Sequence, residues 1–206
     1  MIEVELRGRI TKGLQETLKE FGKEAKFLKE KDRFSLIYWR DEVTDDARDV
    51  KDDPVDIRIK VTNRKEAEIT MKYGKWGVEE KRHEISIPIP LDKVSEAVDF
   101  LKYLGWKHGV VMATKTFSYG FKGVEFALVK AGKETYFEAE KVVENEGQAE
   151  RAREKILDAC AHFNLKIFSE EEFLDLVNSF NNAPGAKFNF DKDNFKDIKE
   201  RFKEFF

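Results

Sequence analysis

The feature that most constrains the fold is a series of eight short segments in which apolar residues alternate with charged or polar ones. Such alternation is typical of β-strands, because successive side chains point to opposite faces. Several neighbouring segments are separated by only a few residues, and connections this short favour antiparallel hairpins over parallel crossovers. The predicted strands are residues 2–10, 33–40, 54–62, 67–74, 79–89, 109–119, 123–130 and 134–143.

Helical periodicity interrupts this series and then follows it. Apolar residues at helical spacing follow the first strand, and an apolar stripe from Val94 to Leu104 ends at Gly105, a good stop signal. Three further helices are predicted after residue 147, the second of them opened by a capping box at Ser169–Glu172. We predict an α+β fold and a single domain over residues 1–206, with a barrel region over about 1–146 and helices over 147–206.

The charged faces of the strands can be arranged in two ways. An ordinary antiparallel sheet turns its charged face to water. However, an even number of hairpin-linked strands can close into a barrel, and the amphipathic helices need an apolar sheet surface on which to pack. With helices outside, an eight-stranded antiparallel closed β-barrel would enclose a polar tunnel. Its basic residues would be Arg7, Arg58, Lys60, Lys72, Arg82 and Lys115, and its acidic residues Glu3, Glu5, Glu84, Glu138 and Glu140.

Such a tunnel has a definite chemistry. Two carboxylates about 5 Å apart repel each other by roughly 3 kcal/mol at an effective dielectric constant near 20, so clustering them inward is costly unless a cation lies among them. Carboxylate oxygens without His or Cys suit Mg²⁺ or Mn²⁺. Arginine and lysine on facing strands suit phosphate oxygens. A metal together with a basic cradle is the equipment for phosphoryl transfer.

In their order and spacing, these motifs resemble those of the CYTH proteins, the triphosphate tunnel metalloenzymes. The segment Glu3-Val-Glu5-Leu-Arg7 is similar to the family's first-strand motif of two glutamates and a lysine, and the resemblance covers about residues 1–180. The other segments that carry it are Arg58-Ile-Lys60, Thr70-Met-Lys72, Arg82-His-Glu84, Leu104-Gly105-Trp106, Lys115 and Phe137-Glu138-Ala-Glu140. The family includes thiamine triphosphatases, inorganic tripolyphosphatases and class IV adenylyl cyclases.

The resemblance implies a role for each of these residues. The implied metal ligands are Glu3, Glu5, Glu138 and Glu140; the implied phosphate ligands are Arg7, Arg58, Lys60, Lys72, Arg82 and Lys115. Glu5, Arg7 and Lys72 would be catalytic, and Glu84 would support the site. Three residues depart from the family pattern: Arg7 replaces a lysine, Phe117 replaces a basic residue, and Val129 stands where an acidic residue is common. Arg7 cannot serve as a base, because an arginine pKa lies above ~12.

Composition limits the remaining possibilities. The net charge of −3 indicates no general attraction to nucleic acid or to a membrane, and no apolar run approaches the roughly 18–20 residues of a membrane span. The single cysteine, Cys160, fits a reducing compartment, so we expect a soluble, cytoplasmic protein. A homodimer through the Phe-rich segment 188–206 stays open.

We therefore expect an enzyme, a divalent-metal-dependent phosphohydrolase of a small-molecule triphosphate such as tripolyphosphate, thiamine triphosphate or a nucleoside triphosphate. Two alternatives remain. A class IV type adenylyl cyclase would use the same basic residues to make cyclic AMP. A non-catalytic triphosphate- or polyphosphate-binding protein would explain the departures at Phe117 and Val129.

Overall fold

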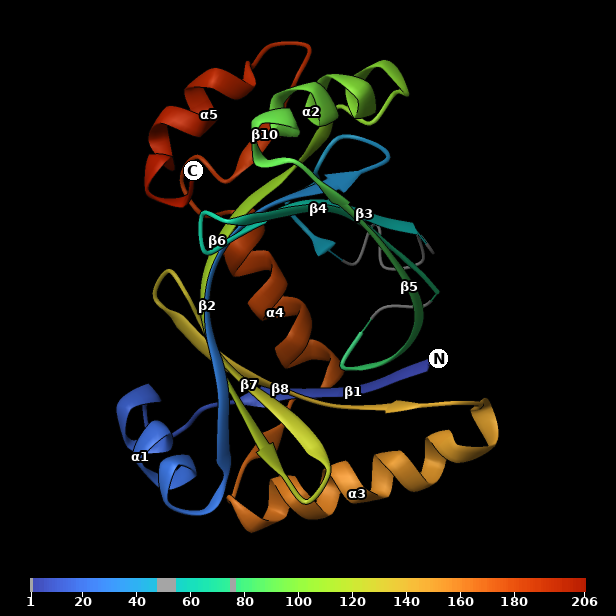
Figure 1. Cartoon of the computed structure of the whole chain (residues 1–206), viewed down its shortest axis with the longest axis vertical. Helices are drawn as coiled ribbons and strands as arrows, with labels where there is room; N and C mark the ends of the chain where they lie inside the picture. Colours follow the sequence, from blue (N-terminus) through green and yellow to red (C-terminus); the bar gives the residue numbers. More distant parts are fainter. Residues whose placement is uncertain (1, 48–54, 75–76) are drawn as a thin grey trace. The chain divides into compact units, whose positions relative to one another are not determined.

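The computed structural model describes residues 2–47, 55–74 and 77–206, and the side chains of residues 79–82 lie outside the description. Figure 1 labels the elements along the chain. The strands are β1 (Ile2–Arg9), β2 (Lys26–Trp39), β3 (Val55–Thr62), β4 (Glu66–Tyr73), β5 (Glu79–Ile89), β6 (His108–Phe121), β7 (Val124–Ala131), β8 (Glu134–Val143), β9 (Lys166–Ile167) and β10 (Lys187–Asn189). The α-helices are α1 (Leu14–Glu24), α2 (Val94–Tyr103), α3 (Ala149–His162), α4 (Glu170–Asn181) and α5 (Phe195–Arg201).

The strands form one ten-stranded sheet with the order β10-β6-β2-β3-β4-β5-β1-β8-β7; β9 pairs with β1, and β6 also pairs with β7. Every pairing whose register is known is antiparallel. The predicted α+β class and antiparallel sheet are thus confirmed. The predicted number of eight strands is wrong, because the short strands β9 and β10 also join the sheet. The closed barrel is not confirmed by this sheet.

Two tight turns set the register of their hairpins. Asn63 and Arg64, between β3 and β4, have φ angles of 53° and 57°, and Lys122 and Gly123, between β6 and β7, have φ angles of 49° and 75°. Two consecutive residues with positive φ are the signature of the type I′ turn, whose twist matches that of the flanking strands. Because side chains alternate with a period of two, these turns decide which residues share a face.

Contacts divide the chain into two compact units, each built from three segments. The first unit comprises residues 1–31, 74–83 and 114–175, and the second comprises 32–73, 84–113 and 176–206. Helix α3 begins at Ala149, close to the predicted boundary between the barrel region and the helices, but the two units do not follow that boundary. The single domain stays a prediction.

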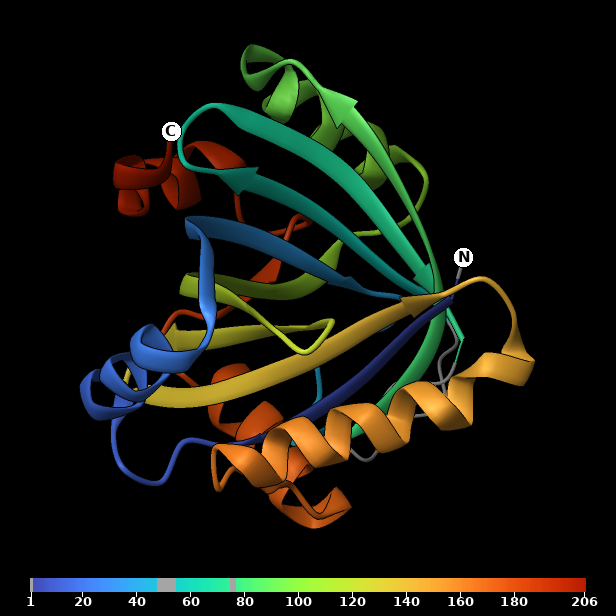
Figure 2. The same cartoon turned by 60° about the horizontal axis from the view of Figure 1, so that its bottom comes forward.

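In the first unit, α3 packs along β8 and β1, as Figure 2 shows. The core between the helices and the sheet contains fully buried Leu6, Phe126, Phe137 and Ile156. Phe21 of α1 adds a ring that stacks on Phe163 with centroids 3.9 Å apart. Burying the apolar face in this way leaves the opposite face of β1, β8 and β7 to charged side chains.

In the second unit, the apolar faces of β2, β3 and β4 pack with α2, α5 and β10. Phe34, Leu36, Ile59 and Val61 are fully buried in this core. The partly buried C-terminal rings of Phe202, Phe205 and Phe206 pack on it. The alternate residues of β3 and β4 carry the polar side chains.

One boundary differs strongly from its prediction. Strand β2 begins at Lys26, whereas the sequence predicted a start at residue 33. The prediction missed the first residues because Lys26 to Glu30 are exposed and do not alternate between apolar and polar side chains. By contrast, the predicted capping box is confirmed: the Glu172 amide donates to Ser169 Oγ at 3.1 Å, and the Ser169 amide donates to Glu172 Oε2 at 2.9 Å. No helix in the described part of the chain is long and apolar enough to cross a membrane.

Candidate functional site

The first group of functional side chains lies on the charged face of β1 and β8. In the register of these strands, Glu5 lies opposite Glu140, and Arg7 lies opposite Glu138. Glu3 precedes Glu5 by two residues and therefore shares its face. One carboxylate oxygen from each of Glu3, Glu5 and Glu140 lies within 4.8 Å of those of the other two. We call these three residues the carboxylate trio.

The trio concentrates negative charge in a partly buried place. Burial raises the pKa of Glu140 to about 8, and the neighbouring carboxyl groups of Glu3, Glu125 and Glu138 add to this rise. A pKa this high shows that ionising Glu140 is unfavourable without a counter-charge. Three convergent carboxylates without nitrogen or sulfur ligands fit a hard divalent cation such as Mg²⁺ or Mn²⁺.

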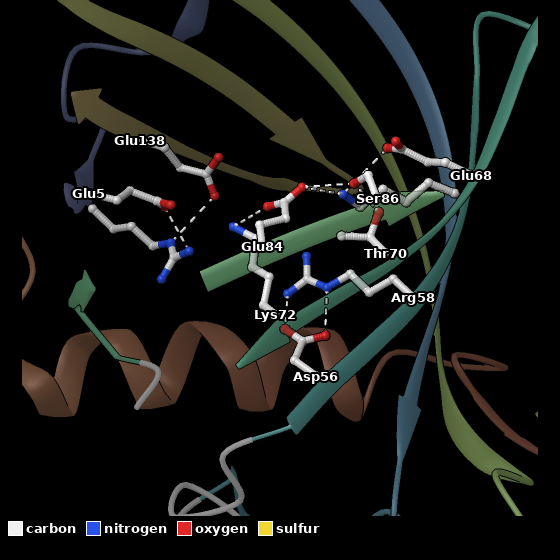
Figure 3. Close-up of polar contacts among 11 residues, drawn as sticks. Glu5, Asp56, Arg58, Glu68, Thr70, Lys72, Glu84, Ser86 and Glu138 are labelled. Atoms are coloured by element: carbon white, nitrogen blue, oxygen red, sulfur yellow. Dashed lines mark hydrogen bonds and ion pairs between the residues drawn. The ribbon is translucent and has the colours of Figure 1, made fainter. Parts of the chain in front are cut away.

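Glu138, which was predicted to be a fourth metal ligand, lies outside the trio. Its Oε1 is 3.4 Å from Arg7 Nε, while Arg7 Nη2 is 2.7 Å from Glu5 Oε1. Figure 3 shows Glu5 and Glu138 close to each other, and both contact this guanidinium group. Arg7 Nη1 also donates to the Gly77 carbonyl at 2.7 Å. The structure thus brings three of the four predicted metal ligands together and pairs the fourth with arginine.

Glu125 was missed by the sequence analysis. It lies on β7, directly opposite Glu140 of β8, and its Oε1 is 3.5 Å from Lys29 Nζ. The sequence could have predicted its place. A turn centred between Gly132 and Lys133 sets residue 125 opposite residue 140. Val129 stands where the family pattern has an acidic residue. It lies on the same face of β7 as Glu125, but it is buried opposite Tyr136.

The second group of functional side chains lies on the polar face of β3, β4 and β5 in the second unit, as Figure 3 shows. Lys60 Nζ lies 3.6 Å from Glu84 Oε1, and Lys72 Nζ lies 3.3 Å from Glu84 Oε2. Lys60 Nζ is also 3.5 Å from Glu68 Oε1. Arg58 donates through Nε and Nη2 to the two carboxylate oxygens of Asp56, a residue that the sequence analysis had overlooked. We call Arg58, Lys60 and Lys72 the basic trio.

Burial and charge act against each other in this group. Burial lowers the pKa of Lys60 to about 8, although the Glu84 carboxylate favours its charged form. Burial also acts to raise the pKa of Glu84, but the charges of Lys60 and Lys72 outweigh it, so that the pKa lies below its ordinary value. Glu84 is therefore ionised and forms ion pairs with the two lysines. The basic trio is largely neutralised by the protein's own carboxylates.

One predicted phosphate ligand, Lys115, is not brought to these groups. Lys115 lies opposite Lys130 of β7, and Phe117 lies opposite Leu128, so both lie on the sheet face opposite that of the Glu125 side chain. Lys115 is exposed and pairs with Glu30, their charged atoms 2.6 Å apart. Arg82 lies in β5 opposite Glu3, and its side chain is outside the described part.

Comparison with known proteins connects these groups to a fold. No protein-family model matches the sequence, and no curated protein matches it significantly. A protein of Pyrococcus horikoshii has a TM-score of 0.66 and 23% identity over 85% of this chain and 97% of its own. A Vibrio parahaemolyticus protein, provisionally described as an adenylate cyclase, has a TM-score of 0.61 and 16% identity over 84% of this chain and 92% of its own.

A third structure adds an activity to the comparison. It is a Hippeastrum protein, provisionally described as an adenylyl cyclase, whose dominant activity is that of a triphosphatase; its TM-score is 0.55 at 14% identity, over 81% of this chain and 89% of its own. At these identities the comparisons show the fold alone. The chain therefore has the fold of these cyclase-like proteins, as the CYTH resemblance implied.

Proposed function

We propose that this protein is an enzyme, a divalent-metal-dependent phosphohydrolase acting on a triphosphate compound. The observation that carries the proposal is the carboxylate trio, in which three strand-borne carboxylates converge to within 4.8 Å. Support comes from the fold, which is shared with a protein of dominant triphosphatase activity. Fold alone does not decide function, so the argument depends on the side chains.

Each group has a part in this proposal. Glu3, Glu5 and Glu140 would hold Mg²⁺ or Mn²⁺, which when bound would neutralise charge on phosphate oxygens and acidify water. Arg58, Lys60 and Lys72 would bind the phosphate groups, with Arg82 as a further ligand. Glu84 would keep the two lysines charged and oriented. The proposal leaves Lys115 out, since it lies on the other face of its strand.

The reaction requires little covalent chemistry from the protein. Water attacks the terminal phosphorus, the bond from that phosphorus to the bridging oxygen breaks, and the products are orthophosphate and a diphosphate compound. Lys72, in ion-pair contact with Glu84, can offer its charge to the phosphate oxygens as negative charge moves toward the bridging oxygen. Arg7 cannot remove a proton from water, since its pKa is too high.

A second candidate function is a non-catalytic triphosphate-binding protein. It is favoured by Val129, which is buried opposite Tyr136 at the position where an acidic residue was expected. One fewer carboxylate on this face weakens metal binding and therefore catalysis, while the basic trio remains to bind phosphate groups.

Product analysis tests the proposal. The purified protein is incubated with tripolyphosphate, thiamine triphosphate or ATP, with Mg²⁺, with Mn²⁺ or with EDTA. Metal-dependent release of orthophosphate supports the hydrolase, whereas cyclic AMP and diphosphate from ATP would identify a cyclase. Binding measured by calorimetry without turnover would favour the binding protein. Absence of both binding and turnover would refute the proposal.

Matched variants make the test specific. Glu140→Gln should abolish the metal-dependent turnover without loss of folding, because it removes a ligand and relieves repulsion. Arg58→Ala should mainly weaken the affinity for the triphosphate. Lys65→Ala, in the exposed β3–β4 turn, is the control and should alter neither. Full turnover by Glu140→Gln would show that the metal assignment is wrong. The homodimer and the cytoplasmic location stay predictions.

A further inference from the structure

Arg7 places a positive charge among the carboxylates on the charged face of the first unit. Arg7 follows Glu3 and Glu5 on the same face of β1, and its cross-strand neighbour is Glu138. Two cross-strand pairs between β1 and β8 on this face differ in kind. Glu5 and Glu140 are like charges that repel, whereas Arg7 and Glu138 are opposite charges that attract.

Arg7 is held in place from several sides. Its guanidinium contacts Glu5 at 2.7 Å, Glu138 at 3.4 Å and the Gly77 carbonyl at 2.7 Å. It also lies over the ring of Phe173, 5.4 Å from the centroid. The side chain is only 9% exposed. A planar guanidinium with this many fixed partners does not leave them readily.

This placement has two effects on any cation at the carboxylate trio. Glu138 is engaged by arginine, and its carboxylate lies outside the trio. In addition, the fixed positive charge beside Glu5 repels a further cation in its neighbourhood. Paired metal ions in phosphoryl-transfer sites lie about 3.5–4 Å apart and need carboxylates to share. Here the guanidinium contacts the two carboxylates that a second ion would need.

We propose that Arg7 is a built-in cation that takes the place of a second metal ion, so that the first unit binds one divalent ion at the carboxylate trio rather than two. This inference rests on the proposed function only in its assumption that the trio binds metal. Arg7 is then a positioning residue: it holds Glu5 and Glu138 and limits the number of ions. It does not itself serve as a phosphate ligand.

The test counts Mn²⁺ ions bound to the purified full chain, using the loss of the free Mn²⁺ signal in electron paramagnetic resonance. The wild-type protein should bind one ion. Arg7→Met keeps an unbranched side chain but removes the guanidinium group and so frees Glu138; this variant should bind two. Adding Glu138→Gln to Arg7→Met should return the number to one.

Arg9→Met is the matched control. Arg9 is the next residue on the same face of β1, and its guanidinium lies over the Phe168 ring at 5.9 Å. This variant should bind one ion, as the wild type does. In EDTA, Arg7→Met should unfold at a lower temperature than Arg9→Met, because it leaves buried carboxylates without a counter-charge, and Mn²⁺ should restore much of the difference.

Two ions bound by the wild type, or none, would overturn the inference whether or not Arg7→Met folds. One ion bound by Arg7→Met, together with a clear loss of tripolyphosphate affinity, would also overturn it, since Arg7 would then be a phosphate ligand. The proposed function can fail separately: a wild-type protein that binds one Mn²⁺ but releases no phosphate supports the inference and refutes the hydrolase.

Discussion

Replacing Lys60 by methionine is expected to stabilise the ligand-free protein at neutral pH. The Lys60 side chain is 7% exposed. Burial lowers its pKa from 10.5 to about 8, even though Glu84 and Glu68 favour the charged form. A lowered lysine pKa means that the folded protein holds the ammonium group at a cost that the unfolded chain does not bear.

The magnitude follows from this difference in pKa. At 1.36 kcal/mol per unit, a fall from 10.5 to about 8 corresponds to about 3 kcal/mol of lost stability below pH 8. Methionine removes this cost, and the attraction between Lys60 and Glu84 is already included in the lowered pKa. The net expectation is a gain of about 3 kcal/mol in the free energy of unfolding at pH 7.

The gain should depend on pH in a defined direction. Between about pH 8 and pH 10.5 the unfolded chain holds more protons at residue 60 than the folded protein, so wild-type stability rises with pH in this window. Lys60→Met lacks this rise, and its advantage should shrink toward pH 10.5. Urea unfolding at several pH values measures both curves, with Lys65→Met as the exposed control. A variant less stable than wild type at pH 7, or an advantage independent of pH, would refute the reasoning.

Two further predictions concern the first unit. Gly8→Ala should destabilise the protein by 2 kcal/mol or more, roughly the cost of overpacking, because the new Cβ would lie 2.2 Å from the Lys166 carbonyl and 2.5 Å from the Phe137 ring. Gly22→Ala, whose Cβ meets nothing within 4 Å on α1, should instead add about 1 kcal/mol; urea unfolding that ranks the two variants otherwise contradicts this. Because the folded-state pKa of Glu140 is raised to about 8, wild-type stability in EDTA should fall from pH 5 to pH 8. The stability of Glu140→Gln relative to wild type should therefore increase from pH 5 to pH 8. A stability difference that does not change with pH would count against a raised pKa of Glu140.

Alternation identified the strands well where one face was clearly apolar. The predicted strands 79–89 and 134–143 coincide with β5 and β8, and the pairing of β1 with β8 brings together Glu5 and Glu140, as the carboxylate motifs indicated. The exposed start of β2 could not be found in this way. Its charged residues gain their extended form from pairing with a neighbouring strand rather than from burial, and pairing leaves no mark on composition.

The site was predicted in part. Residue types and spacing identified the carboxylate trio and the basic trio, but not which charges would neutralise one another. Asp56 shares the polar face with Arg58, two residues away, so its ion pair was readable from the strand period alone. Lys115 was predicted to be a phosphate ligand because its place in the order of motifs along the sequence matched the family pattern. Its alternation with Phe117, Tyr119 and Phe121 already indicates the apolar face of β6.

The pairing of β1 has a consequence for how the protein is made. Its partners β5, β8 and β9 all come later in the chain, and Glu5 meets a partner in β8 135 residues downstream, at Glu140. At a synthesis rate of about 5–20 residues per second, the first strand waits on the order of ten seconds before β8 leaves the ribosome. Until then the edge of β1 that pairs with β8 is exposed to other chains. Glutamate and arginine at every second position make it a poor template for them, so the charges that form the site also protect the nascent protein from aggregation.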